Sequence, residues 1–232
     1  VYLGKDTKLN RWVAIKTLSL SQNFDKNELQ EATIWFFQEA SAAGRLTHPH
    51  IVSVYEAGEA LDLAYISMEF FKGGNLVAYT KPENLLDISK VIDIIIKISD
   101  ALDYAHEQGV VHRDIKPANI MYNPASEDIK IADFGIAHIT DSNKTKTGII
   151  LGTPLYMSPE QLAGKKLNGR TDIFSLGVML YQLLTAELPF QADSMATLMF
   201  KIANEPHIDI IKVRPDIPQC IRRIVNKALQ KD

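Results

Sequence analysis

The chain has 232 residues, of which 46% are hydrophobic and 23% charged, a globular composition that excludes a disordered or collagen-like chain. Its 25 basic and 28 acidic side chains give a formal net charge of −3, so no basic surface field indicates nucleic acid or an anionic membrane as a partner. A single cysteine, Cys220, excludes an internal disulfide and fits a reducing compartment. At about 150 residues per domain, the length allows one large domain or two small lobes.

The N-terminal part of the chain combines strand-like and helical patterns. Runs rich in β-branched and aromatic residues predict strands within 1–18, 51–57 and 63–70. Between the first two runs, apolar residues at three- and four-residue spacing predict a helix over 27–46. The sequence Lys72-Gly73-Gly74-Asn75 contains strand and helix breakers, so we expect a small β-rich part with one helix to end here.

The rest of the chain is mostly helical. Apolar residues recur at helical spacing over 88–108, and Gly109 follows as a C-terminal cap. Short apolar runs at 120–122 and 129–132 predict two strands joined by a turn that contains proline. Helical patterns then resume, and the apolar stretch 173–186 is shorter than the roughly 18 residues that cross a bilayer, so it predicts a buried helix. These patterns predict an α+β fold with a small β-rich lobe, a larger helical lobe and a ligand cleft between them.

Two polar motifs follow the long predicted helix. The first is His112-Arg113-Asp114-Ile115-Lys116-Pro117-Ala118-Asn119, and Asp133-Phe134-Gly135 begins 19 residues after Asp114. Carboxylate and amide oxygens bind hard divalent cations, a lysine offsets phosphate charge, and a further carboxylate can orient an attacking hydroxyl. Asp114 alone would be read as part of a solvated polar loop. The two motifs together, at this spacing, favour phosphoryl transfer.

Together with Trp12-Val13-Ala14-Ile15-Lys16, these motifs resemble the signature set of the protein kinase family. The resemblance covers essentially the whole chain and implies a two-lobed protein-kinase-like fold. It implies that Lys16 holds the α- and β-phosphates of ATP, that Asp114 is catalytic, and that Lys116 contacts the transferring phosphate. The residues that it implies as ligands of Mg²⁺, with Mn²⁺ as an alternative, are Asn119 and Asp133.

Three further features extend the resemblance. The segment from Leu151 to Glu160 is similar to the one that closes the kinase activation loop, with Ser158 in place of the usual alanine. Asp172, at the start of the buried helix, is an ordinary cap by itself, but the resemblance implies that it accepts hydrogen bonds from the catalytic-loop backbone. The residue sequences of these segments, and of His48-Pro49-His50-Ile51-Val52, most resemble those of bacterial kinases of the eukaryotic type.

The resemblance also implies a nucleotide site. Met68 matches the gatekeeper, and Glu69 and Phe71 would read adenine through their backbone groups. Glu39, on the helix predicted over 27–46, matches the glutamate that pairs with the strand lysine, whereas a solvent-facing glutamate is the alternative. The adenine ring would lie between side chains that are otherwise ordinary apolar core residues, namely Ala14, Met121 and Val1. His112 and Phe134 are expected to serve packing rather than chemistry.

Lys116 is typical of catalytic loops that act on serine or threonine, and Thr153 points the same way. The resemblance therefore implies protein substrates that carry serine or threonine hydroxyls. By the same resemblance, Arg113, directly before Asp114, implies activation by phosphorylation of the loop between Asp133 and Glu160. The candidate phosphosites are Thr145 and Thr147, for which an unmodified surface loop is the alternative. A kinase–kinase dimer for autophosphorylation would be a further partner.

The expected domain organisation is one catalytic domain over 1–232. We expect a small lobe at 1–70, a hinge region at 71–75 and a large lobe at 76–232. A glycine-rich loop is expected before Val1. An arginine partner for Glu160 is expected after the last residue, so the chain is interpreted as truncated at both ends.

Three function classes remain at this point: an active protein serine/threonine kinase that uses ATP and Mg²⁺, a nucleotide-binding pseudokinase or scaffold, and a small-molecule kinase. The closing segment from Leu151 to Glu160 disfavours the third, and the complete set of motif residues disfavours the second. Neither nucleic acid nor membrane contact is expected within this fragment. The use of ATP and the single cysteine predict a cytoplasmic location, with a membrane anchor outside the fragment left open.

Overall fold

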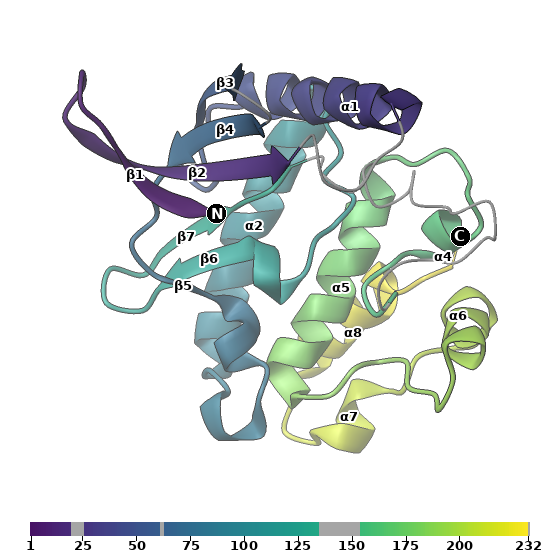
Figure 1. The fold of residues 1–232 in the computed structure, drawn as a ribbon. Coiled ribbons are helices and arrows are strands. Elements are labelled where there is room, and N and C mark those ends of the chain that lie inside the picture. The colour runs from purple at the N-terminus through teal and green to yellow at the C-terminus, as the bar shows by residue number, and fades with distance from the viewer. Residues whose placement is uncertain (20–25, 61–62, 135–153, 232) are drawn as a thin grey trace.

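The computed structural model describes residues 1–19, 26–60, 63–134 and 154–231, and the side chains of residues 26–32, 35 and 39 lie outside this description. Figure 1 shows a smaller part, made of a β-sheet and helix α1, above a larger and mainly helical part. The prediction of an α+β fold with two unequal lobes is confirmed.

The smaller part is an antiparallel sheet against which α1 (Lys26–Gly44) packs. Its strands lie in the order β1-β2-β4-β3. Phe36 and Ala40 of α1 are buried against Ile66 and Met68 of the sheet, and with Val52 and Ala64 they form the core of this part. The strands are β1 (Tyr2–Asp6), β2 (Arg11–Ser19), β3 (Val54–Ala60) and β4 (Leu63–Glu69).

The register of β2 against β4 determines which side chains share a face. Ala14 is paired with Met68, and Lys16 is paired with Ile66. Directly opposed residues of an antiparallel pair lie on the same face. Ala14 and Lys16 therefore lie on the inner face of the sheet, where Lys16 reaches Asp133 of the larger part.

The strand predicted over 51–57 is wrong in its first three residues, because β3 begins at Val54. Residues 51–53 instead run beside β7 (Asp128–Ile131) of the larger part. The Val52 N–H donates to the Ile131 carbonyl at 2.9 Å, and the Ile131 N–H donates to the His50 carbonyl at 2.8 Å. An apolar pattern records burial but not the partner strand, so it suits both pairings. These two hydrogen bonds connect the smaller part of the molecule to the larger part.

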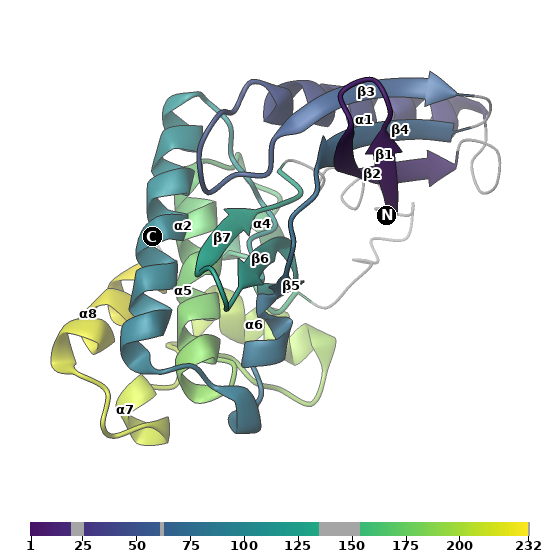
Figure 2. The same cartoon turned by 90° about the vertical axis from the view of Figure 1, so that its left-hand side faces the viewer.

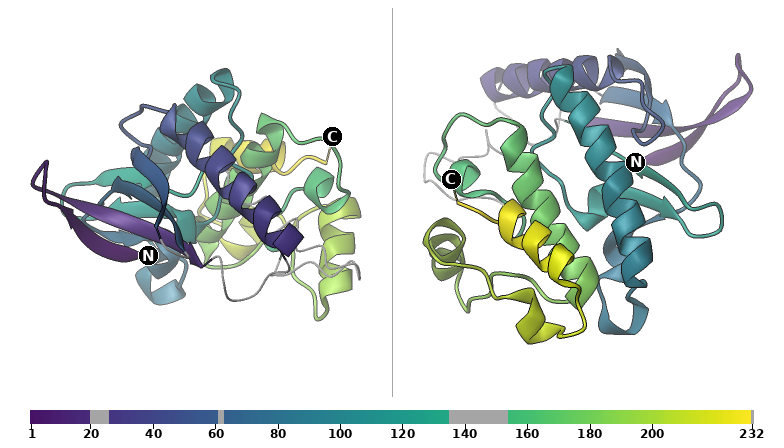
Figure 3. Two further views of the ribbon diagram at one scale, coloured as in Figure 1. Left: turned by 45° about the horizontal axis from the view of Figure 1, so that its top comes forward. Right: turned by 180° about the vertical axis from the view of Figure 1, so that it is seen from behind.

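The larger part is built on α2 and α5, which lie side by side, with α8 against α5 (Figures 2 and 3). The interior of α5 is buried, as predicted for residues 173–186, although Ile173 itself is 42% exposed. None of the helices in the described ranges is long and apolar enough to cross a bilayer. The helices are α2 (Ile88–Glu107), α4 (Pro159–Leu162), α5 (Gly169–Thr185), α6 (Met195–Asn204), α7 (Ile210–Val213) and α8 (Gln219–Ala228).

A small sheet, in the order β5-β6-β7, lies between α2 and the sheet of the smaller part (Figure 2). Its β6–β7 hairpin corresponds to the strands predicted at 120–122 and 129–132. Its strands are β5 (Gly74–Asn75), β6 (Ile120–Asn123) and β7 (Asp128–Ile131). The larger part also contains the short 3-10 helices Leu76–Tyr79, Pro82–Asn84 and Pro117–Asn119.

Gly177 lies where α5 closely approaches the end of α8. A Cβ at this position would lie 2.7 Å from the Cβ of Ala228 and 3.2 Å from a methyl carbon of Leu229. Overpacking of this kind costs about 1–3 kcal/mol, whereas replacing glycine by alanine in a helix gains about 1 kcal/mol. We therefore expect Gly177→Ala to lower the free energy of unfolding by about 1 kcal/mol, measured by urea denaturation.

The matched control is Gly44→Ala at the end of α1, where a Cβ would meet nothing within 4 Å. We expect this change to leave the free energy of unfolding unchanged or slightly higher, because only the helix propensity changes. Equal effects of the two substitutions would show that the approach of α5 to α8 does not limit the side chain at Gly177.

Candidate active site

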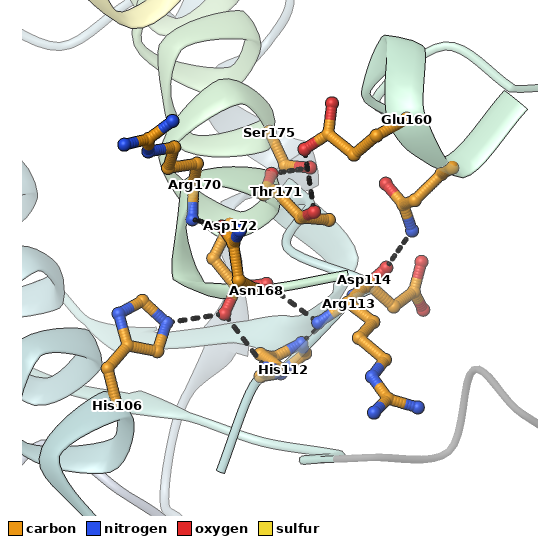
Figure 4. A network of polar contacts seen from close by, with 11 residues as sticks. His106, His112, Arg113, Asp114, Glu160, Asn168, Arg170, Thr171, Asp172 and Ser175 are labelled. Carbon is orange, nitrogen blue, oxygen red and sulfur yellow. Dashed lines mark hydrogen bonds and ion pairs between the residues drawn. The ribbon is translucent and has the colours of Figure 1, made fainter. Parts of the chain in front are cut away.

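The carboxylate of Asp172 holds the loop that follows α2. Gly109, with φ of 74°, follows the end of α2 at Glu107. Asp172, in the first turn of α5, is 0% exposed and accepts the N–H groups of His112 at 2.8 Å and Arg113 at 2.7 Å. In Figure 4, dashed lines join the two oxygens of this carboxylate to the backbone of the loop. Arg113 has a positive φ of 71°, a strained conformation that these two hydrogen bonds stabilise.

Two polar residues of the loop, Asn119 and Lys116, converge on the carboxylate of Asp114. Asn119 donates from Nδ2 to the carbonyl of Asp114 at 2.8 Å and to its Oδ2 at 2.9 Å. Lys116 Nζ lies 2.7 Å from the same Oδ2. The side chain of Asp114 remains 39% exposed, so it is fixed in orientation while it stays open to a substrate.

Asp133 follows β7 and lies beside this loop. The N–H of Ala132 donates to the Asn119 carbonyl at 2.9 Å, which brings Asp133 next to Asn119. Asp133 has a positive φ of 61°, and its Oδ1 lies 2.9 Å from Lys16 Nζ of β2. Residues 117 positions apart in the sequence thus meet between the two parts of the molecule.

His112 joins the loop to the Asp133 segment. Its Nε2–H donates to the Ala132 carbonyl at 3.0 Å, and its Nδ1 accepts the Asp114 N–H at 3.2 Å. The ring is 0% exposed and meets Phe134 edge to face at a centroid distance of 4.7 Å. The packing role expected of His112 and Phe134 is present, and the hydrogen bonds add a positioning role to His112.

The donor set suits a hard divalent cation. Both N–H groups of the Asn119 amide face Asp114, so its carbonyl oxygen is the atom left for a ligand. That oxygen and the Asp133 carboxylate are ligands of the kind that Mg²⁺ or Mn²⁺ prefers. Mg²⁺ is usually held by one or two carboxylates together with substrate phosphates, so the small number of protein ligands also fits.

Met68, at the end of β4, is 9% exposed and paired with Ala14. Met121 lies in β6 of the small sheet, and Val1, at the start of the chain, is 82% exposed. The N–H of Glu69 donates to the Ser53 carbonyl at 2.8 Å, so this N–H is not free to bind a nucleotide.

The side chain of Glu69 is also engaged. Its Oε2 accepts the Ser53 N–H at 3.2 Å and lies 3.0 Å from Lys130 Nζ. Lys130 belongs to β7 and also donates to the Ile51 carbonyl at 3.3 Å. The residue predicted to read adenine is thereby connected to the strand that leads to Asp133.

The segment before α5 supports the loop from the other side. Ser158 is 0% exposed and forms a capping box with Gln161 at the start of α4. Gln161 Nε2 donates to the Arg113 carbonyl at 2.8 Å. Glu160 accepts the Thr171 hydroxyl at 2.7 Å (Figure 4). Burial raises the pKa of Tyr156 to about 12, so its hydroxyl stays protonated and donates to Gln182 at 2.5 Å.

Sequence reasoning missed two residues of this site, Gln161 and His106. The spacing of Ser158 and Gln161 predicts a capping box, which was a usable signal for Gln161. His106 lies in the last turn of α2, and no local pattern marks it. Other predicted residues lie outside the described part of the structure, namely Thr145, Thr147, Thr153 and the side chain of Glu39.

The sequence matches the family described as "Protein kinase domain" over residues 1–232. The probable serine/threonine-protein kinase PknB of Lactococcus lactis is 38% identical over 234 residues, which cover 100% of this chain and 36% of the relative. The serine/threonine-protein kinase PrkC of Bacillus subtilis is 38% identical over 233 residues, covering 100% of this chain and 35% of the relative. The chain thus spans little more than a third of the length of these curated relatives.

Among solved structures, the kinase domain of PknI from Mycobacterium tuberculosis matches with a TM-score of 0.74 at 26% sequence identity. The match covers 100% of this chain and 82% of that chain. The fold described above is therefore shared over its whole described extent.

Proposed function

Because the chain belongs to the protein kinase domain family, we propose that it transfers the γ-phosphate of ATP to serine or threonine hydroxyls of proteins. The observation that carries the proposal is the convergence of four side chains from three segments: Lys16 of β2, Asp114 and Asn119 of one loop, and Asp133 after β7. One cluster thus offers a cation for phosphates, oxygen ligands for a metal ion and a carboxylate that can act as a general base.

In the proposed mechanism, Asp114 orients the attacking hydroxyl and accepts its proton. Lys116, 2.7 Å from Asp114, places a positive charge where charge develops on the transferring group. Lys16 exchanges its contact with Asp133 for the α- and β-phosphates, which frees the carboxylate. Asn119 and Asp133 would hold Mg²⁺, or Mn²⁺, which when bound would neutralise part of the phosphate charge.

We propose that residues 71–75 form the hinge between the lobes and that adenine binds beside it. The Glu69 carbonyl and the Phe71 N–H would read its edge, and Met68 would limit the depth of the site. Glu39 would pair with Lys16 in the active arrangement. Apolar contacts to the ring would come from Ala14, Met121 and Val1.

Two observations support a protein substrate with serine or threonine as acceptor. Relatives that cover the whole chain are named serine/threonine-protein kinases. Lys116 is the loop residue typical of that class, and its Nζ is directed at Asp114. The closing segment with Thr153 and Glu160, which small-molecule kinases lack, further favours proteins over metabolites.

We further propose activation by phosphorylation of Thr145 or Thr147, in trans within a kinase–kinase dimer. Arg113 supports this proposal because its Nε is buried and has no hydrogen-bond partner among the described residues. Figure 4 shows its guanidinium turned away from Asp172. A phosphate adds a charge of roughly −1.5 to −2 with which such an arginine can pair.

The test is phosphoryl transfer from radiolabelled ATP with Mg²⁺ by the full-length protein. We expect label on a generic protein substrate, recovered after acid hydrolysis as phosphoserine or phosphothreonine. Nucleotide binding without any transfer would favour a pseudokinase or scaffold. Label on a small metabolite alone would favour a small-molecule kinase, and either result would overturn the proposal.

A further inference from the structure

We infer that His106 is a positioning residue for phosphoryl transfer, acting on the catalytic loop through Asp172. This inference rests on the proposed function. His106 lies at the end of α2, Asp172 lies at the start of α5, and the two residues are 66 positions apart in the sequence. His106 Nε2 lies 2.8 Å from Asp172 Oδ2, and because a carboxylate oxygen can only accept, the ring N–H donates.

His106 completes the hydrogen bonding of a fully buried carboxylate. Asp172 Oδ1 accepts the Arg113 N–H, and Oδ2 accepts both the His112 N–H and the His106 ring. Among the described residues, His106 is the side chain that donates to Asp172, and the other two donors are backbone amides. A buried carboxylate is stabilised by each donor that it accepts, so losing the ring weakens the anchor.

The geometry also fixes the ring itself. Its side chain is only 21% exposed, and the backbone of Gly169 packs so closely that a Cβ there would lie 2.6 Å from Nδ1. The ring is thus wedged between the end of α2 and the start of α5, as Figure 4 shows for its approach to Asp172. It transmits the relative position of two helices to the two backbone amides that precede Asp114.

The consequence reaches catalysis because Asp114 follows Arg113 directly. The strained backbone of Arg113 is held from one side by Asp172 and from the other by Gln161. If Asp172 Oδ2 loses one donor, the carboxylate can rotate toward other partners, and the turn at Arg113 loosens. A shift of about 1 Å in a catalytic group can cost up to about 100-fold in rate. ATP binding depends on other segments and should change little.

The test compares His106→Leu with His106→Gln in the full-length protein. Leucine keeps the size but donates nothing, whereas the glutamine amide can donate from nearly the same place. We expect His106→Leu to lower kcat about tenfold with the KM for ATP within about twofold, and His106→Gln to recover kcat to within about threefold.

His207→Leu is the matched control. His207 is likewise partly buried, and its side-chain hydrogen-bond partner among the described residues is Asn226 at 3.0 Å, outside the catalytic loop. We expect its kcat to equal that of the unmodified protein. A kcat of His106→Leu equal to that of the control, or a loss that glutamine does not recover, would overturn the inference.

A second measurement does not depend on activity. Hydrogen exchange at the amides of His112 and Arg113 should be faster in His106→Leu than in His207→Leu, because the carboxylate that protects them is less firmly held. Unchanged exchange would overturn the inference even if the unmodified protein transferred no phosphate. Absence of transfer by the unmodified protein would instead overturn the proposed function, so the two failures are distinguishable.

Discussion

Asp114→Asn is expected to lower kcat by about 10²–10⁴-fold while nucleotide affinity stays unchanged. An amide is the size of a carboxylate, but it cannot accept the proton of the attacking hydroxyl. Asn119 can still donate to the remaining oxygen, so the loop keeps its shape. The contact with Lys116 is lost, but both side chains are more than a third exposed, so stability should fall by less than about 1 kcal/mol.

The measurement is a steady-state assay of the full-length protein together with binding of a fluorescent ATP analogue. Asp100→Asn is the control, because this aspartate likewise has a polar side-chain partner, His48 at 3.2 Å, but lies outside the cluster. Its kcat should be unchanged. If Asp114→Asn keeps more than half of the unmodified kcat, the carboxylate is not the general base, and the proposed mechanism is wrong.

Asp172→Ala is expected to destabilise the protein by about 3–5 kcal/mol and to abolish most of the activity. The substitution leaves the N–H groups of His112 and Arg113 without an acceptor, and an unsatisfied buried donor costs about 1–3 kcal/mol. It also removes the group that holds the positive φ of Arg113. Stability and activity should therefore fall together, unlike the effect of Asp114→Asn.

Urea denaturation measures the first effect, and the assay described for Asp114→Asn measures the second. Asp100→Ala is the control, since its side chain is 70% exposed and its loss should cost less than about 1 kcal/mol. A loss of stability at Asp172→Ala no larger than that of the control would mean that the catalytic loop is held by other contacts.

The helices and strands were predictable where their patterns are local. The apolar spacing over 88–108 and the cap at Gly109 correspond to α2, which ends at Glu107. The sequence predicted that the run at 51–57 is buried, but it did not predict that its residues pair with two different strands. Its first residues run beside β7 and its later residues join β4, because hydrogen-bond partners depend on which strands are neighbours in the fold.

The residues of the candidate active site were also predictable, but some of their contacts were not. Motif spacing indicated Asp114, Asn119 and Asp133 as chemically related. Motif spacing did not indicate the 2.9 Å contact between Asp133 and Lys16, or the ion pair between Glu69 and Lys130. These contacts join segments of different lobes, so they depend on how the lobes pack.

The sequence by itself determined the fold class, the order of most elements and the residue types of the cleft, because periodicity and motif spacing are properties of neighbouring residues. Only the tertiary structure decided how the catalytic loop is held. His106 contacts Asp172 across 66 positions of sequence, from the end of α2, and Gln161 contacts Arg113 across 48 positions, from α4. The physical reason is that a buried carboxylate and a strained backbone need partners within hydrogen-bond distance, and helix packing alone selects which side chains provide them.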